Sequence, residues 1–205
     1  MVLKICGITR LADAEVAVAG GATAVGFVFW AKSPRFIAPA DAAAIVAALP
    51  DSVEKVGVFV NESRAAIERI AADVGLTVVQ LHGDERADDA AGLSRPVIRA
   101  VTLDDEPVCD GWPAGTRFLL DAADRERRGG TGQRVDLARA SAFASRRRVI
   151  LAGGLTPENV GEAVAAVRPW GVDVSSGVEA TPGVKDSGKV AAFLANARRA
   201  FEKRG

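Results

Sequence analysis

Two residues whose side chains can transfer protons stand at the ends of apolar runs in the sequence. Cys6 ends the run Val2 to Cys6, and Asp121 ends the run Arg117 to Asp121. A thiolate can remove a proton from carbon, and a carboxylic acid can protonate a leaving oxygen. If both runs are strands that end at the same edge of a sheet, the two residues form a base and an acid at one site. The pattern therefore predicts general acid-base catalysis.

Each of these residues also has an explanation that needs no catalysis. Lys4 lies two positions before Cys6, on the same side of a strand, where its ammonium would lower the pKa of the thiol. The alternative is that Cys6 has no catalytic role and is an inert buried residue that packs as a small hydrophobe. Burial would raise the pKa of Asp121 enough for an acid, but an aspartate here could equally cap a turn or pair with an arginine of the next loop. The presence of both candidates at strand ends favours catalysis.

Three glycine-rich segments follow the last three predicted strands and could bind phosphate. Glycines in such loops let backbone N–H groups approach the phosphate oxygens. One loop of this kind would be an ordinary turn, whereas three in succession favour a ligand site. The residues assigned to this site are Gly130, Gly153, Gly154, Ser175, Ser176 and Gly177.

Three other polar residues are candidates for the same site. Arg35 lies in a predicted loop, where its planar guanidinium could hold a carboxylate or simply be solvated. His82 is the only histidine, and it could line the site or be a hydrogen-bonded structural residue. Asp173 could orient its neighbours or balance the charge of Lys4.

Two other kinds of site are not supported. The segment Gly183 to Lys189 reads G-x-x-x-x-G-K, but Val190 stands where a P-loop needs a serine or threonine that binds magnesium. We therefore predict that it is the turn into the last helix. One histidine and two distant cysteines, Cys6 and Cys109, form no convincing metal cluster.

Short aliphatic runs alternate with segments of helical spacing along the whole chain. Most runs are continuously apolar, which is typical of parallel strands covered on both faces. The predicted strands are Val2 to Cys6, Ala24 to Phe29, Val53 to Val60, Thr77 to Leu81, Val97 to Val101, Arg117 to Asp121, Val149 to Ala152 and Val172 to Val174. Helices are predicted at Leu11 to Ala19, Ala42 to Leu49, Ile67 to Val74, Asp136 to Ala144 and Lys189 to Glu202. Another helix is predicted to start with Thr156 as its N-cap and Pro157 as its first residue. The segment Thr102 to Gly115 leaves room for only a short helix.

Strict alternation fits either an open doubly wound sheet or a closed eightfold barrel. An open sheet of this length usually has fewer strands, and the first turn, Cys-Gly-Ile-Thr, lacks the G-x-G-x-x-G fingerprint. We therefore predict an α/β fold, a single (βα)8 TIM barrel over residues 1–205. Such barrels build their active sites at the C-terminal ends of the strands, where Cys6 and Asp121 stand.

The composition excludes several classes of protein. Its 26 basic residues balance 26 acidic ones, so no overall positive field attracts nucleic acid or an anionic membrane. No apolar run approaches the roughly 20 residues that cross a bilayer. Two cysteines are too few for a disulfide framework, and the N-terminal segment lacks the pattern of a secretory signal. We therefore expect a cytoplasmic protein.

Taken together, the motifs resemble those of one family, the phosphoribosylanthranilate isomerases of tryptophan biosynthesis. The matching segments are KICGIT (Lys4 to Thr9), GFVFWAKSPRFI (Gly26 to Ile37), VGVFVN (Val56 to Asn61), QLHGDE (Gln80 to Glu85), LLDA with the later GGTG (Leu119 to Gly132), LAGGLTPENV (Leu151 to Val160) and VDVSSGVE (Val172 to Glu179). They follow the family order over nearly the whole chain. Arg125, Arg127 and Arg128 match no family motif, so no role is assigned to them.

The resemblance implies a barrel that catalyses the Amadori rearrangement of N-(5-phosphoribosyl)anthranilate to 1-(2-carboxyphenylamino)-1-deoxyribulose 5-phosphate. It implies that Cys6 is the general base, that Asp121 is the general acid and that Arg35 holds the anthranilate carboxylate. The expected partner is this small phosphosugar, with no metal ion, organic cofactor, nucleic acid or membrane. The sequence is compatible with a monomer or a homodimer.

Two alternatives stay open at this point. The related isomerase of histidine biosynthesis, or a version that accepts both substrates, would have an aspartate at the position of Cys6, so the cysteine counts against it. A barrel that binds a phosphosugar without catalysis is disfavoured because a base and an acid are both present.

Overall fold

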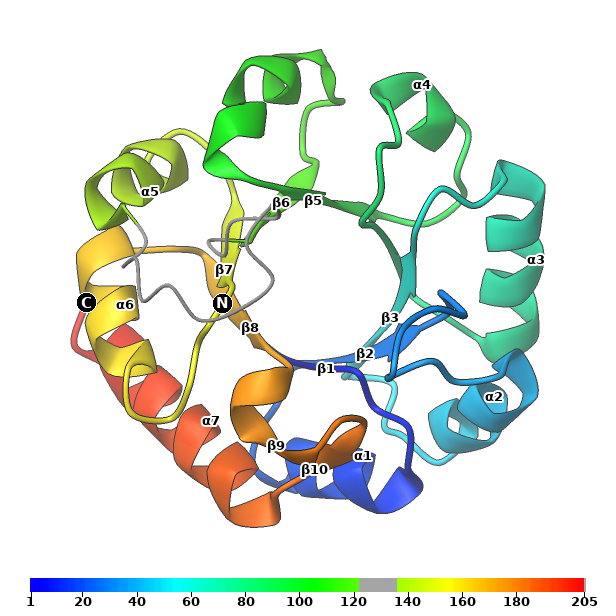
Figure 1. The fold of residues 1–205 in the computed structure, drawn as a ribbon, viewed down its shortest axis with the longest axis horizontal. Helices are drawn as coiled ribbons and strands as arrows, with labels where there is room; N and C mark the ends of the chain where they lie inside the picture. The colour runs from blue at the N-terminus through cyan, green and yellow to red at the C-terminus, as the bar shows by residue number, and fades with distance from the viewer. Residues whose placement is uncertain (122–135, 205) are drawn as a thin grey trace.

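The computed structural model of the chain describes residues 1–121 and 136–204, in which eight parallel strands close into a barrel (Figure 1). The strands are β1 (Val2–Cys6), β2 (Ala24–Val28), β3 (Glu54–Phe59), β4 (Val78–Leu81), β5 (Val97–Val101), β6 (Arg117–Asp121), β7 (Val149–Ala152) and β8 (Gly171–Val174). Each strand pairs with the next in the chain, and β8 pairs with β1. The predicted eightfold barrel is confirmed, and the open sheet is excluded.

Helices surround the barrel on the outside (Figure 1). The α-helices are α1 (Leu11–Ala19), α2 (Pro39–Ala47), α3 (Arg64–Val74), α4 (Ala87–Ala90), α5 (Leu137–Ala144), α6 (Val160–Val167) and α7 (Ser187–Glu202), and the 3-10 helices are η1 (Leu103–Gly111) and η2 (Ser176–Val178). Local signals set their ends. At the start of α3, the Ser63 hydroxyl accepts a hydrogen bond from the N–H of Ala66, and the helix stops at Gly75, whose φ of 78° is left-handed.

The side chains of the strands alternate between two cores. Those that point outward pack against the helices, and Phe27 of β2, Phe59 of β3 and Phe143 of α5 are all buried in this layer. Those that point inward fill the barrel with small and branched residues such as Val56 and Ile150. The filled interior fixes the strand ends, and it is these ends that position the polar residues above it.

A buried ion pair interrupts the apolar filling of the barrel. Nζ of Lys4 on β1 lies 2.9 Å from Oδ1 of Asp173 on β8, and the side chain of Lys4 is fully buried. Burial alone would lower the pKa of Lys4, but the carboxylate of Asp173 outweighs it and raises the pKa. Lys4 is therefore charged, and Asp173 balances it.

Some local features, among them the short helix α4, differ from the sequence predictions. Helix α6 begins at Val160 rather than at the predicted Pro157. Thr156 caps the turn ahead of the helix, since its hydroxyl accepts from the N–H of Glu158 at 3.2 Å. The Asn159 side chain accepts from the Thr156 N–H and donates to the Gly154 carbonyl, and these bonds form a turn ahead of the helix. A hairpin of β9 (Glu179–Thr181) and β10 (Val184–Lys185) was not predicted, because neither strand is long enough to show a periodicity.

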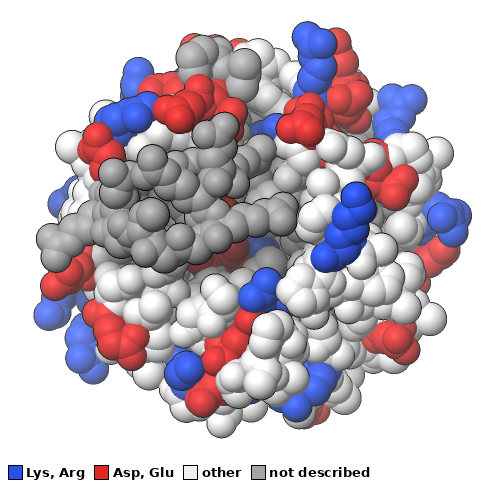
Figure 2. Space-filling model, in the orientation of Figure 1, with Lys and Arg blue, Asp and Glu red and all other residues white. Residues whose placement is uncertain are grey.

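The surface carries charges of both signs. In the view of Figure 2, lysine and arginine alternate with aspartate and glutamate around the described part of that face, with no extended area of one sign. Within residues 1–121 and 136–204, no helix has both the length and the apolar character needed to span a bilayer. The segment Gly183 to Lys189 leads through β10 into α7, as predicted.

Candidate active site

A cavity of about 450 Å³ opens where the barrel strands end, and both proton-transfer candidates line it. Cys6 is the last residue of β1 and Asp121 the last of β6. In the closed ring, β7 and β8 separate these strands on one side and β2 to β5 on the other, so the two residues face the cavity from across its mouth. An acid and a base can therefore act on one ligand between them.

The other predicted site residues that the structure describes also line this cavity. These are Arg35, His82, Gly153, Gly154, Ser175, Ser176 and Gly177. Gly130 lies outside the described residues, as do Arg125, Arg127 and Arg128. Among the residues that the structure does describe, no cluster of three His, Cys, Asp or Glu could hold a metal ion.

The environment of Cys6 differs from the expectation that Lys4 lowers its pKa. Burial raises the pKa of the Cys6 thiol above its ordinary value, and the Lys4 ammonium offsets this only in part. Asp173, which pairs with Lys4, adds a negative charge that raises the thiol pKa further. In the unliganded protein at neutral pH, the sulfur therefore holds its proton.

Glycines shape the side of the cavity formed by the loops after β7 and β8. Gly153 and Gly154 have φ angles of 83° and 66°, which are left-handed and favour glycine. A Cβ on Gly177 would lie 1.9 Å from the carbonyl oxygen of Leu155, so the two loops touch at that point. Beside them, the Ser175 hydroxyl is buried and has no hydrogen-bond partner among the described residues. It is available to a ligand in the cavity.

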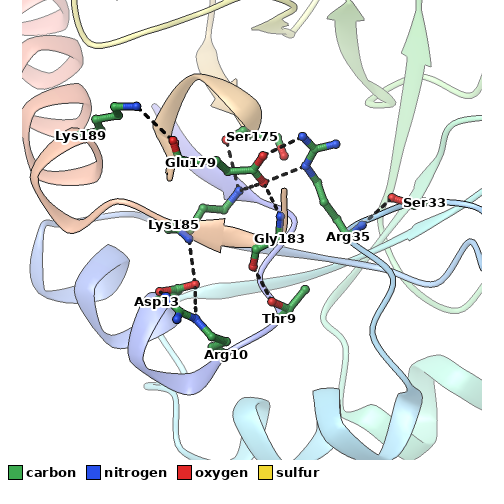
Figure 3. Close-up of polar contacts among 10 residues, drawn as sticks. All are labelled: Thr9, Arg10, Asp13, Ser33, Arg35, Ser175, Glu179, Gly183, Lys185 and Lys189. Atoms are coloured by element: carbon green, nitrogen blue, oxygen red, sulfur yellow. Dashed lines mark hydrogen bonds and ion pairs between the residues drawn. The ribbon is translucent and has the colours of Figure 1, made fainter. Parts of the chain in front are cut away.

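The guanidinium of Arg35 is held by Glu179 (Figure 3). Nε and Nη2 of Arg35 lie 2.8 and 2.7 Å from the two carboxylate oxygens of Glu179. Burial alone would raise the pKa of Glu179, but hydrogen bonds from Arg35 and Lys185 outweigh it and hold the pKa below its ordinary value. Sequence analysis missed Glu179, because no spacing relates two residues that are 144 positions apart.

Gln80 is a second cavity residue that sequence analysis missed. Its Nε2 lies 2.9 Å from Nδ1 of His82. The two side chains therefore form one hydrogen-bonded pair at the cavity wall. Gln80 is 1% exposed, and its Oε1 has no hydrogen-bond partner among the described residues. A polar side chain in the otherwise apolar run Val-Val-Gln-Leu was the available signal.

An aromatic side chain completes the cavity wall next to Cys6. Trp30 follows β2 and packs against the small cluster of Cys6, Val28 and Val58. The cavity thus combines a hydroxyl and glycine loops, a cationic side chain, an aromatic surface and the two candidate proton-transfer groups. This set suits an anionic sugar that carries an aromatic acid.

Comparison with known proteins shows the family. The family profile described as N-(5'phosphoribosyl)anthranilate (PRA) isomerase matches residues 3–196. The chain belongs to the phosphoribosylanthranilate isomerase family. The isomerase of Pseudomonas fluorescens (strain Pf0-1) is 48% identical over 195 residues, which cover 93% of this chain and 95% of the relative. That of Pelobacter propionicus is 46% identical over 194 residues, which cover 94% and 93%.

Solved structures of phosphoribosylanthranilate isomerases have the same fold. The enzyme from Thermotoga maritima superposes with a TM-score of 0.88 at 44% identity, covering 97% of this chain and all of that one. A second structure, at 42% identity and a TM-score of 0.86 with the same coverage, was solved in complex with reduced 1-(o-carboxyphenylamino)-1-deoxyribulose 5-phosphate. The family resemblance inferred from the motifs is confirmed.

Proposed function

We infer that this chain catalyses the Amadori rearrangement of its family, converting N-(5-phosphoribosyl)anthranilate to 1-(2-carboxyphenylamino)-1-deoxyribulose 5-phosphate, with Asp121 as acid and Cys6 as base. The observation that carries the assignment of these roles is that both side chains line one cavity from different sides of the strand ring. The cavity of about 450 Å³ lies within the usual range for small-molecule sites.

The reaction needs two proton transfers, one at oxygen and one at carbon. Asp121 protonates the ribose ring oxygen, the bond from that oxygen to C1 breaks, and the nitrogen lone pair forms the protonated Schiff base. The Cys6 thiolate then takes the C2 proton, and the C2–H electrons form the C1–C2 double bond of an enolamine. Protonation at C1 and loss of the hydroxyl proton at C2 give the ketone, so no electrons leave the substrate.

The raised thiol pKa bears on the base role of Cys6. The reactive form has the proton on Asp121 and the negative charge on Cys6, whereas burial favours the proton on sulfur. The reactive form is therefore a minor one, but a thiolate of raised pKa is a stronger base toward a carbon acid. Cys6 and Asp121 act as a pair that shares one proton.

Several binding groups line the cavity together with the acid and the base and would hold the sugar against them. The glycine loops and Ser175 supply the phosphate site, and Arg35 supplies the site for the anthranilate carboxylate. Trp30 offers an apolar face to the anthranilate ring. Binding of the phosphate and of the carboxylate, neither of which reacts, supplies the energy that aligns the reacting carbons with the pair.

Substrate selectivity tests this assignment of function. We expect initial rates on freshly generated phosphoribosylanthranilate to exceed those on the aminoimidazole substrate of the histidine pathway by orders of magnitude. Comparable turnover of the two substrates would favour the dual-substrate alternative. Binding of phosphoribosylanthranilate without any product would instead show that the barrel is only a phosphosugar-binding protein.

Removing the Arg35 side chain tests the carboxylate site. Arg35→Ala is expected to raise KM by about 10- to 100-fold with a much smaller change in kcat, because a charge-assisted hydrogen bond contributes about 1.5–3 kcal/mol and Arg35 does not touch the reacting carbons. Steady-state kinetics on phosphoribosylanthranilate measure both constants. An unchanged KM would remove Arg35 from its assigned role.

The shared proton predicts the pH dependence of catalysis. A carboxyl group ordinarily titrates below a thiol, so kcat/KM is expected to be level between the two pKa values and to fall about tenfold per pH unit once the single proton is lost. Because burial raises the pKa of Cys6, this fall should begin above the ordinary thiol pKa of about 8.5. Profiles of kcat/KM from pH 6 to 10.5 test this. A fall that begins below pH 8 would contradict it.

A further inference from the structure

The carboxylate of Glu179 lies between two cations rather than one. Its Oε1 accepts from Nε of Arg35 at 2.8 Å and from Nζ of Lys185 at 3.0 Å (Figure 3). Glu179 and Lys185 are only 8% and 5% exposed, so little water screens these contacts. Lys185 also donates to the carbonyl of Ser175, at 3.2 Å, and so touches the loop assigned to the phosphate.

The charges of these three side chains, Arg35, Glu179 and Lys185, add to plus one. The pKa of Glu179 lies below its ordinary value, so the carboxylate is ionised at neutral pH. If Glu179 paired with Arg35 alone, the pair would be neutral and would not attract the carboxylate of a ligand. Because Lys185 shares Glu179, the trio of Arg35, Glu179 and Lys185 keeps one unit of positive charge beside the cavity.

The contact with Glu179 also fixes the direction of Arg35. A guanidinium has five N–H groups, and Glu179 uses only the edge formed by Nε and one N–H of Nη2. The end of the guanidinium, formed by Nη1 and the second N–H of Nη2, can hold another carboxylate in the same bidentate way. Arg35 lines the cavity, so one arginine can serve Glu179 and a ligand together.

The hairpin that carries Glu179 and Lys185 is itself fastened to the barrel. The N–H of Lys185 donates to Asp13 of α1 at 3.0 Å, and Asp13 is bound by Arg10. At the tip, the N–H of Gly183 donates to Glu179, and its carbonyl accepts from the Thr9 hydroxyl (Figure 3). The trio therefore rests on a rigid support rather than on a free loop.

We propose that Glu179 and Lys185 are positioning residues for the aryl carboxylate of the substrate: Glu179 aims the end of Arg35 at it, and Lys185 keeps the trio positively charged. The proposal rests on the proposed function in one respect, that the ligand carries a carboxylate near Arg35. It makes Lys185 a determinant of selectivity for a carboxylate that it need not touch.

The test compares two ligands that differ only in that carboxylate. One is the reduced product analogue, reduced 1-(o-carboxyphenylamino)-1-deoxyribulose 5-phosphate, and the other is its phenylamino counterpart without the carboxyl group. Calorimetry gives the Kd of each, and their ratio is the carboxylate preference. The carboxyl-free ligand reports on the phosphate site and on folding of every variant.

Lys185→Met is expected to lower the carboxylate preference about tenfold, because the trio becomes neutral. If Lys185→Met does not fold, Lys185→Gln replaces it and is expected to lower the carboxylate preference by the same factor. Lys189→Met is the matched control, since Lys189 donates to the backbone carbonyl of Glu179 at 3.0 Å and not to its carboxylate. Its preference should equal that of the wild type.

A charge-restoring double variant separates electrostatics from loss of structure. In Glu179→Gln combined with Lys185→Met, the amide oxygen can still accept a hydrogen bond from Arg35, which keeps its full charge, so the double variant should regain most of the carboxylate preference that Lys185→Met loses. A preference unchanged by Lys185→Met, or lowered without recovery in the double variant, overturns the proposal. A wild-type protein without any carboxylate preference would instead overturn the role of Arg35 in the proposed function.

Discussion

Replacing Cys6 by serine is expected to lower kcat by about two to four orders of magnitude, which is the usual scale for a proton-transfer group. A hydroxyl ionises at far higher pH than a thiol, so the variant has no base for the C2 proton. Serine is close to cysteine in size, and Cys6 is 8% exposed, so the barrel should remain folded. Initial rates on phosphoribosylanthranilate and a thermal melt measure the two effects separately.

The other cysteine provides the matched control. Cys109 is also buried, and burial raises its pKa to about 11, but it lies outside the cavity that Cys6 lines. Cys109→Ser should therefore leave kcat near that of the wild type. Near-normal kcat in Cys6→Ser would remove Cys6 from the reaction, whatever the control shows.

Replacing Asp121 by asparagine is expected to reduce kcat by about the same factor, two to four orders of magnitude. The amide fills the same space at the end of β6 but cannot give a proton to the ring oxygen, so the sugar does not open. KM should change much less than kcat, because the phosphate and carboxylate contacts remain. Steady-state kinetics of the purified variant test this prediction.

A conservative variant distinguishes loss of the acid from loss of shape. Asp121→Glu keeps a carboxyl group at the cavity mouth, one methylene further from the strand, and should retain clearly more activity than Asp121→Asn. Equal activity in the two variants would mean that the carboxyl proton is not used. Activity close to that of the wild type in Asp121→Asn would contradict the assignment directly.

The barrel could be predicted from the sequence because of how its strands are covered. The helices cover one face of each strand and the packed interior covers the other. Because both faces are buried, the strands are continuous apolar runs such as Val149 to Ala152. Once the barrel is predicted, the strand ends must meet at one mouth. This is why the sequence alone predicts a single site for Cys6, Asp121 and the glycine loops.

Other features depend on contacts that no local pattern contains. The pKa of Cys6 is set by burial and by the pairing of Lys4 with Asp173, 169 residues away in the chain. The contact of Arg35 with Glu179 joins the loop after β2 to a hairpin of two very short strands. The turn before α6 is stabilised by hydrogen bonds from the Thr156 N–H to Asn159 and from the Glu158 N–H to Thr156, and the helix starts only after it.

The most direct test of the account is the initial rate of product formation, followed by the change in anthranilate fluorescence, when freshly generated phosphoribosylanthranilate is mixed with the purified protein. We predict ready turnover by the wild type without added metal or cofactor, and loss of that turnover in the double variant Cys6→Ser with Asp121→Asn. Tight binding of the substrate with no product, or equal rates in the wild type and the double variant, would contradict it.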